Sequence, residues 1–227
     1  MDKNDLISVI IPVKNGSRGN YLNQAIEGIQ KQGMNTEIIV VDDGSEDNTA
    51  EIAKQYGCKV VRHESSKGPV ISKNDGIKIA KGKYIMFHDH DDILRDGSLK
   101  KLYDELTSDD NISAVEAKVQ DWYSPELSDD DKKSIQKKPE AYWGLFTGAI
   151  LMKKAIFDVI GLFNESIKAG EIIEWQSKTH SAGLTVKKLD FVSTNRRLHS
   201  SNFGRTNKKT EFKDYAALLR ARLAAGK

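Results

Sequence analysis

Four short apolar runs, rich in valine and isoleucine, recur in the first half of the chain, and the segments between them have helical spacing. The runs occupy residues 7–13, 37–41, 59–61 and 84–87, and the helical segments occupy residues 21–30, 48–56 and 70–80. A continuously apolar strand needs both of its faces dry, and crossover helices achieve this by covering a parallel sheet on both sides. The sequence therefore predicts an α/β fold with a Rossmann-like, mostly parallel sheet flanked by helices.

The second half has a less regular pattern. It predicts helices over residues 97–106, 153–160 and 171–182 and strands over residues 113–119 and 184–189. Residues 121–140 are polar, contain proline and are dense in charge, which predicts a mobile surface loop. An ordered acceptor-binding flap is the alternative, because loops of this length are either functional or disordered.

These elements predict one domain and an appendage. The domain covers residues 1–207, with a nucleotide-binding half over about 1–119 and an acceptor half over about 141–207. The appendage, residues 208–227, holds a basic amphipathic helix over residues 211–223. We expect its apolar stripe to pack on the domain or on a second copy of the chain in a homodimer. Contact with a membrane surface is the alternative.

The composition limits the partners. The 35 Lys and Arg nearly balance the 33 Asp and Glu, and the formal net charge of +2 gives no reason to expect a nucleic-acid partner. The single cysteine, Cys58, precludes an intrachain disulfide framework, which suits a reducing compartment. No stretch approaches the roughly 20 apolar residues of a membrane span. We expect a cytoplasmic protein, with peripheral contact at the inner membrane face as the alternative.

Two acidic turns follow predicted strands, at the strand ends where open α/β sheets bind their ligands. The first turn holds Asp42 and Asp43, and the second holds Asp89, Asp91 and Asp92. Carboxylates this close raise one another's pKa unless a cation neutralises them, and their oxygens suit Mg²⁺ or Mn²⁺. For the second turn, the alternative is a solvated acidic turn in which Asp92 caps the next helix.

In their order along the chain, these segments resemble a known family. The stretches SVIIPVKNG, IIVVDDGSEDNT and KGPVISKNDGIKIAKGKYIMFHDHDD are similar to successive signatures of the family 2 glycosyltransferases of GT-A fold. The resemblance covers roughly the first half of the chain. It implies that the nucleobase and ribose are bound by Pro12, Lys14, Asp42 and Asp43.

The resemblance also implies how the diphosphate and a metal ion are held. Lys73 stands where the family usually has arginine and would face the donor phosphates as a point charge. Asp91 would ligate the metal, and Asp89 would reach the ribose or the metal and its water. His199 lies where enzymes of this fold often supply a further metal or pyrophosphate contact. Three arginines of the same stretch would grip diphosphate oxygens, with surface solvation as the alternative for each: Arg196, Arg197 and Arg205.

The general base is expected on the helix over residues 171–182. Family members commonly carry two adjacent acids at its start, whereas this chain has Glu171 followed by Ile172. Glu171 and Glu174 lie three residues apart on one helix face, so both are candidates. We favour Glu174, because the EW pair and the later RRLH resemble a branch of the family. An acid favoured only by the helix dipole is the alternative for Glu171.

Together these features imply an inverting, divalent-metal-dependent glycosyltransferase of the hexosyltransferase type. It would move a sugar from a nucleoside-diphosphate sugar, expected to be a UDP-sugar, to a glycan or lipid-linked acceptor in polysaccharide or glycoconjugate biosynthesis. Two alternatives remain. Ile172 in place of the second acid keeps open a catalytically silent sugar-nucleotide or glycan-binding scaffold of the same fold. A sugar-nucleotide pyrophosphorylase shares the acidic ligands but begins with a glycine-rich, arginine-bearing loop, where this chain has PVKNGSRGN.

Overall fold

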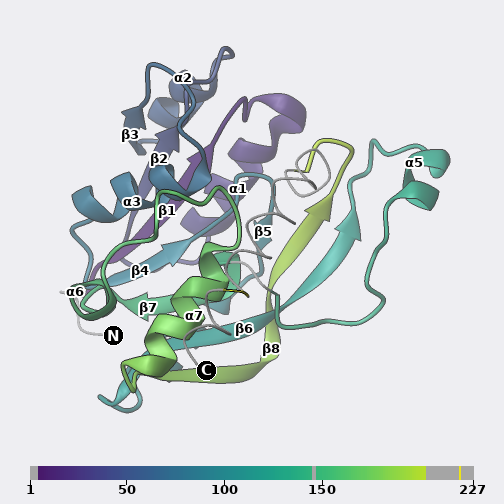
Figure 1. Cartoon of the computed structure of the whole chain (residues 1–227). Coiled ribbons are helices and arrows are strands. Elements are labelled where there is room, and N and C mark those ends of the chain that lie inside the picture. Colours follow the sequence, from purple (N-terminus) through teal and green to yellow (C-terminus); the bar gives the residue numbers. More distant parts are fainter. Residues whose placement is uncertain (1–4, 145–146, 203–219, 221–227) are drawn as a thin grey trace.

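A computed structural model describes residues 5–144, 147–202 and residue 220. Strands and helices alternate through the first half, as the periodicity predicts (Figure 1). The strands are β1 (Ile7–Val13), β2 (Thr36–Asp42), β3 (Lys59–Arg62), β4 (Tyr84–Phe87), β5 (Ile93–Leu94), β6 (Ile112–Tyr123), β7 (Ile150–Lys153) and β8 (Thr185–Leu198). The helices are α1 (Tyr21–Gln30), α2 (Thr49–Gln55), α3 (Pro69–Ile79), α4 (Ser98–Leu106), α5 (Asp129–Ser134), α6 (Ile156–Ile160) and α7 (Glu171–Ser181).

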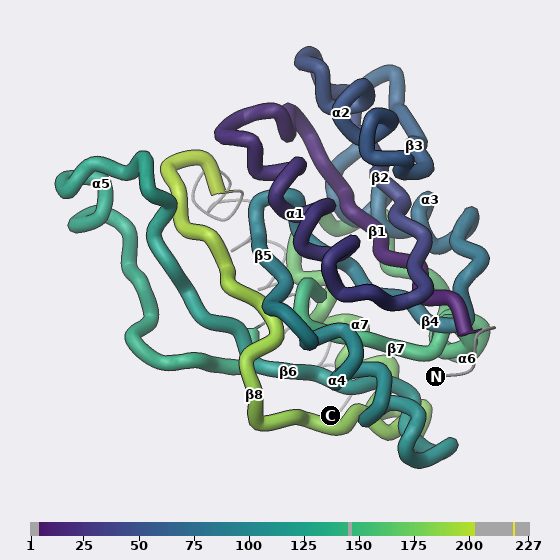
Figure 2. Tube along the Cα trace, turned by 180° about the vertical axis from the view of Figure 1, so that it is seen from behind, coloured from purple at the N-terminus to yellow at the C-terminus, as the bar shows by residue number. Residues whose placement is uncertain are grey.

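The strands of the described residues form one eight-stranded sheet in the order β3-β2-β1-β4-β7-β6-β8-β5. The first four strands of this order are parallel, β7 runs antiparallel to both β4 and β6, and β6 and β8 are parallel to each other. Figure 2 shows the sheet from behind, with β6 and β8 extending beyond the parallel half. The expected mostly parallel sheet is therefore present in the first half, and the second half adds the antiparallel pairing.

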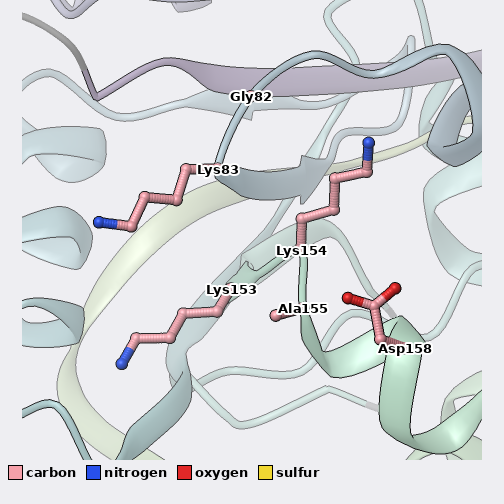
Figure 3. A pocket seen from close by; sticks show the side chains of 6 residues that line it. All are labelled: Gly82, Lys83, Lys153, Lys154, Ala155 and Asp158. Atoms are coloured by element: carbon pink, nitrogen blue, oxygen red, sulfur yellow. The ribbon is translucent and has the colours of Figure 1, made fainter.

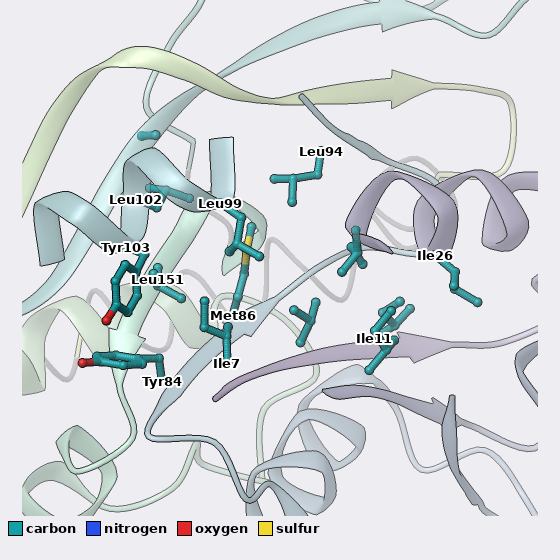
Figure 4. Close-up of a cluster of buried hydrophobic side chains, with 14 of the residues drawn as sticks. Ile7, Ile11, Ile26, Tyr84, Met86, Leu94, Leu99, Leu102, Tyr103 and Leu151 are labelled. Atoms are coloured by element: carbon teal, nitrogen blue, oxygen red, sulfur yellow. The ribbon is translucent and has the colours of Figure 1, made fainter. Parts of the chain in front are cut away.

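Both faces of the parallel half are buried. On β1, Ile7 and Ile11 point to one face and Ile10 points to the other, as the period of two in a strand requires. The first face packs against α1, α2 and α4, where Met86 and Leu151 lie among the helix side chains (Figure 4). The opposite face packs against α3, α6 and α7. Because each fully buried aliphatic side chain contributes roughly 1.5–3 kcal/mol, the two layers stabilise the parallel half whose strand ends carry the acidic turns.

Strands β6 and β8 are longer than the sequence predicts. Strands were expected over residues 113–119 and 184–189, yet β6 runs to Tyr123 and β8 to Leu198. They pair with each other to these ends, with three register irregularities. Asp121 is buried opposite Arg196, and the two side chains approach to 3.5 Å. A polar cross-strand pair thus continues both strands past their apolar residues. The predicted strand ends, at residues 119 and 189, are therefore wrong.

The segment after β6 is also more ordered than expected. It contains helix α5, whose N-cap Ser128 accepts a hydrogen bond from the Asp131 amide. Leu127 and Ile135, on either side of α5, are buried against Leu198 at the end of β8. The prediction of a mobile surface loop over residues 121–140 is therefore corrected, because apolar contacts anchor the segment to the sheet. Its acceptor-binding role stays a prediction.

Two further expectations concern helices. The helix predicted over residues 153–160 begins only at Ile156, because residues 150–153 form the central strand β7. The basic amphipathic helix predicted over residues 211–223 lies outside the described residues. Within the described part of the chain, no helix has the length and apolar character needed to cross a bilayer.

Candidate active site

The two acidic turns lie on either side of the end of β1. The Asp43 amide donates to the Val13 carbonyl at 2.8 Å, and the His88 amide donates to the Ile10 carbonyl at 2.9 Å. The parallel register, with Val13 opposite Asp42, therefore brings both turns to one edge of the sheet. Pro12 is half-buried and Lys14 exposed at the same end of β1. Local sequence alone was sufficient to predict this juxtaposition.

Asp43 is buried, and its carboxylate is fully occupied by the chain itself. His63 Nδ1 lies 2.8 Å and the Lys67 amide 2.7 Å from one carboxylate oxygen, while Ser66 Oγ and the Gly68 amide donate to the other at 2.6 and 2.9 Å. Burial would raise the pKa of Asp43, but these hydrogen bonds outweigh it and hold the pKa below the ordinary value of 3.8. Asp43 therefore anchors the segment of residues 66–68, and its expected nucleobase contact stays a prediction.

Gly44 allows the anchored segment to lie against the turn. Its φ is +70°, and a Cβ built on it would lie 2.9 Å from the carbonyl carbon of Ser65 and from the Ser66 nitrogen. Only glycine fits both that conformation and that approach. The neighbouring Asp42 is fully buried, and its carboxylate accepts from the Ser45 amide at 2.9 Å. The DDGS turn is therefore shaped by its own backbone bonds.

The second turn gathers three carboxylates. Ligand oxygens of Asp89, Asp91 and Asp92 all lie within 4.8 Å of one another. Burial and the charges of Asp91 and Asp89 raise the pKa of Asp92 well above its ordinary value, and burial also raises the pKa of Asp89. Burial would raise the pKa of Asp91 as well, but nearby His90 and a hydrogen bond to His199 lower it instead. These opposed shifts show a cluster that is short of positive charge.

The donor set suits a hard divalent cation. Carboxylate oxygens are the ligands that Mg²⁺ and Mn²⁺ prefer, with imidazole acceptable to Mn²⁺. Asp92 Oδ2 is buried and has no hydrogen-bond partner among the described residues, which a buried carboxylate oxygen rarely tolerates. The residues present therefore fit the expected Mn²⁺ or Mg²⁺.

Strand β8 brings the second half of the chain to this turn. The short strand β5 pairs with it, with Ile93 opposite Asn195, so the residues after 195 run along the acidic turn. His199 Nε2 lies 2.8 Å from Asp91 Oδ2, and Asn202 Nδ2 lies 3.3 Å from the same oxygen. The structure thus places His199 beside Asp91, the arrangement that its predicted metal role requires.

The arginines of this stretch have different surroundings. Arg197 is 2% exposed, and the guanidinium donors contact the chain itself, an arrangement that does not support the predicted grip on diphosphate oxygens. The Arg196 side chain is about one-third exposed and lies near Asp121 and the Tyr142 hydroxyl. Arg205 lies outside the described residues.

Lys73 on α3 and Glu171 on α7 form a buried ion pair. The charge of Lys73 also acts on Asp89, opposing the rise in the pKa that burial causes, so the ion pair adjoins the acidic cluster. Ile172, where the family commonly has its second acid, points into the core. Glu174 has one oxygen 3.1 Å from Lys178, while its Oε2 is buried without a partner among the described residues.

A separate depression lies at the opposite end of β4 (Figure 3). It has a volume of about 410 Å³ and is lined by Gly82, Lys83, Lys153, Lys154, Ala155 and Asp158. Its lysines are already engaged: Lys153 donates to the Asp110 carbonyl and Lys154 to the Ala80 carbonyl. The depression is therefore unrelated to the acidic cluster.

The family described as glycosyl transferase family 2 matches residues 8–161, which include both acidic turns and the strands that carry them. The chain belongs to this family. This confirms the expected family, and structural neighbours described below confirm the expected GT-A fold. The family match and relatives named as glycosyltransferases also confirm the expected enzyme class.

Relatives of this family 2 chain extend the match. Glycosyltransferase GlyG of Streptococcus pneumoniae is 28% identical over 92% of this chain and 74% of its own length. A glycosyltransferase of Rickettsia prowazekii is 34% identical over 72% of this chain and 55% of its own length. The chain therefore spans about three quarters of the first relative and about half of the second.

Two solved structures share the fold. S. aureus TarS in complex with UDP-GlcNAc has a TM-score of 0.65 and 20% identity, covering 86% of this chain and 59% of that one. The mannosyltransferase PcManGT from Pyrobaculum calidifontis, in complex with GDP-Man and Mn²⁺, has a TM-score of 0.69 and 16% identity, covering 94% of this chain and 64% of that one. At these identities the likeness concerns the fold.

Proposed function

We propose that this chain is an inverting, divalent-metal-dependent glycosyltransferase that uses a UDP-sugar donor. The observation that carries the proposal is the cluster of Asp89, Asp91 and Asp92, with His199 2.8 Å from Asp91, beside the Asp42–Asp43 turn. Similar structures hold UDP-GlcNAc in one case and GDP-Man with Mn²⁺ in another, which supports a nucleotide sugar and a divalent ion.

The metal ion would be held by Asp91, Asp89 and His199, and Asp92 Oδ2 in the same cluster, which has no partner among the described residues, would face its positive charge. When bound, it supplies positive charge that stabilises the departing nucleoside diphosphate. In the transfer, the acceptor oxygen forms a bond to the anomeric carbon while the bond from that carbon to the phosphate oxygen breaks. The bonding electrons leave with the diphosphate, and the acceptor proton passes to a carboxylate of the protein.

We assign the base to Glu174, with Glu171 as the alternative. A base needs an oxygen free to take the acceptor proton, and Glu174 Oε2, although buried, has no partner among the described residues. The carboxylate of Glu171 is already paired with Lys73, whose charge also acts on Asp89. Because Glu171 balances the charge of Lys73, the donor phosphates would meet the pair and not a lone lysine.

A silent binding scaffold is the second candidate. It is favoured by one observation: Ile172 replaces the family's second acid and points into the core, where no side chain could serve the acceptor. A pyrophosphorylase is not supported, since the family match is to glycosyltransferases.

The acceptor is proposed to be a glycan or a lipid-linked glycan. A relative named poly(ribitol-phosphate) beta-glucosyltransferase, from Bacillus spizizenii, is 38% identical over 43% of this chain. A cytoplasmic location, contact with the inner membrane face and a homodimer remain proposals.

The test is a panel of nucleoside diphosphates and UDP-sugars, with MnCl₂ or with EDTA, read by thermal shift and by release of UDP. Ligands that bind only the native state stabilise it by an amount that grows with the logarithm of their concentration divided by Kd, so at equal concentration the tighter ligand raises the melting temperature more. We expect UDP to stabilise the protein most, more strongly with MnCl₂ than with EDTA, and to be released from a UDP-sugar. Binding without release would favour the scaffold, and no metal-dependent stabilisation would contradict both.

A further inference from the structure

Arg197 lies between two aromatic rings. Its guanidinium carbon is 4.3 Å from the centre of the Tyr21 ring on α1 and 4.4 Å from the centre of the Trp122 ring on β6. A planar guanidinium can stack on a ring with each face, which the compact ammonium of lysine cannot do. Burial lowers the pKa of Arg197, and the nearby charges of Glu126, Asp91 and Asp92 oppose this, so its guanidinium is held in the field of the acidic turn without a direct ion pair among the described residues.

The donors in the plane of the guanidinium are directed at specific acceptors. Nε donates to the main-chain carbonyl of Asp91 at 2.7 Å, and Nη2 donates to Gln24 Oε1 at 2.5 Å. Nη1 lies 3.5 Å from Ser124 Oγ. The rings fix the plane, and Gln24 fixes the rotation within it, so Nε is held on the Asp91 carbonyl.

The main chain of Arg197 contacts the same turn. Its amide donates to Asp92 Oδ1 at 2.8 Å. Its carbonyl accepts from Asn202 Nδ2 at 3.1 Å, and the same Asn202 nitrogen lies 3.3 Å from Asp91 Oδ2. One residue therefore holds the main chain of Asp91 and the carboxylate of Asp92, and a bond through Asn202 reaches the Asp91 carboxylate.

We propose that Arg197 is a positioning residue that fixes the carboxylates of the acidic turn in the geometry needed for the divalent ion. The inference rests on the proposed function, because it concerns the metal site assigned there. Groups that orient metal ligands without touching the metal typically change metal affinity by about 10- to 100-fold when they are replaced. In this assignment the Arg197 guanidinium acts on the turn in place of the predicted contact with the donor diphosphate.

The principal variant is Arg197→Lys, which keeps the charge but loses the stacking plane and the directed Nε. Its control is Arg95→Lys, because Arg95, directly after β5, also donates to β8, through a 2.8 Å bond to Asn195, and forms no hydrogen bond with Asp89, Asp91 or Asp92 among the described residues. UDP affinity is measured by calorimetry in excess MnCl₂ and in EDTA, and stability by urea unfolding. The ratio of the two affinities reports the metal-dependent part of binding.

We expect Arg197→Lys to lower this ratio at least about tenfold while the affinity in EDTA stays unchanged, and Arg95→Lys to leave the ratio unchanged. A folded Arg197→Lys variant with an unchanged ratio would overturn the inference. Equal loss in MnCl₂ and in EDTA would also overturn it, since Arg197 would then act on the nucleotide. A wild-type protein without any Mn²⁺ dependence would instead overturn the proposed metal site, and the inference with it.

A second variant decides the matter if Arg197→Lys fails to fold. Gln24 is exposed on α1, so Gln24→Leu should leave the fold intact while releasing Nη2 of Arg197. We expect it to lower the same ratio by a smaller factor. In an Arg197→Lys background that folds, Gln24→Leu should have no additional effect, because the two residues act through one contact. An unchanged ratio in Gln24→Leu, or an undiminished effect in that background, contradicts the inference.

Discussion

His199 Nε2 lies 2.8 Å from Asp91 Oδ2, although the two residues are separated by more than one hundred positions in the chain. The His199 ring also packs against Tyr21, with ring centres 5.2 Å apart. The contact joins the end of β8 to the turn after β4, which places a residue of the second half at the centre of the acidic cluster. It makes Asp91 the carboxylate whose replacement is most informative.

Asp91→Asn is expected to abolish Mn²⁺-dependent UDP binding while leaving the protein folded. A neutral amide keeps the shape of the side chain but loses the charge that holds a hard cation. The measurement is calorimetric titration with UDP in MnCl₂ and in EDTA, together with urea unfolding. Asp96→Asn, at an exposed aspartate of the following segment, is the control. Retained metal-dependent affinity in Asp91→Asn would remove Asp91 from the site.

Glu174→Gln is expected to reduce sugar transfer by about 10²- to 10⁴-fold with little change in UDP affinity, because a general base acts in the chemical step and not in donor binding. The measurement is the initial rate of UDP release from the donor that the panel identifies, with an acceptor present. An active Glu174→Gln variant together with an inactive but folded Glu171→Gln variant would move the base to Glu171.

Glu171→Gln is expected to act mainly on stability. It leaves Lys73 buried opposite a neutral amide, and breaking a buried pair typically costs about 3–5 kcal/mol. Urea unfolding measures the loss, and Lys73→Met combined with Glu171→Leu should recover part of it, since the double change removes both charges. If Glu171→Gln lowers the unfolding free energy by only about 0–1 kcal/mol, as at exposed ion pairs, then water reaches the Lys73–Glu171 pair.

Gly44→Ala is expected to destabilise the protein and weaken UDP binding, because the new Cβ would collide with the backbone of residues 65–66. Gly57→Ala is the matched control: Gly57 has a similar φ of +72°, but no atom lies within 4 Å of its Cβ position. The control thus carries the conformational strain, of order 1 kcal/mol, without the collision. Equal losses of unfolding free energy in the two variants would show that the close approach is unimportant.

The bonds to Asp43 predict a pH dependence. Because the pKa of Asp43 is lower in the folded protein than its ordinary value of 3.8, the carboxylate contributes stability that is complete above that value. This contribution is lost as the pH falls through the lowered pKa. The difference in unfolding free energy between wild type and Asp43→Asn should therefore shrink below about pH 4. Urea unfolding at pH 7 and at a series of acidic pH values measures it, and a constant difference would contradict the assignment.

Much of the first half of the chain could be predicted from local sequence. The strand ends at Val13, Asp42 and Phe87 follow from apolar runs that stop at polar turns, and parallel strands place such ends at one edge. The two acidic turns therefore lie at the same edge in any parallel arrangement of these strands, whereas their closeness depends on the strand order, which places only β1 between β2 and β4. The helices that cover them follow from their spacing for the same local reason.

The partners of individual side chains were decided by tertiary structure. Arg196 and Arg197 are adjacent on β8, so one must point to each side of the sheet, and a shift of one residue in the register would exchange them. The pairing of β8 with β5 and β6 turns Arg197 inward between Tyr21 and Trp122. In the same way Lys73 meets Glu171 across 98 positions of sequence. Periodicity determines that a residue lies on a strand or helix, but burial and pairing between distant segments determine what its charged atoms contact.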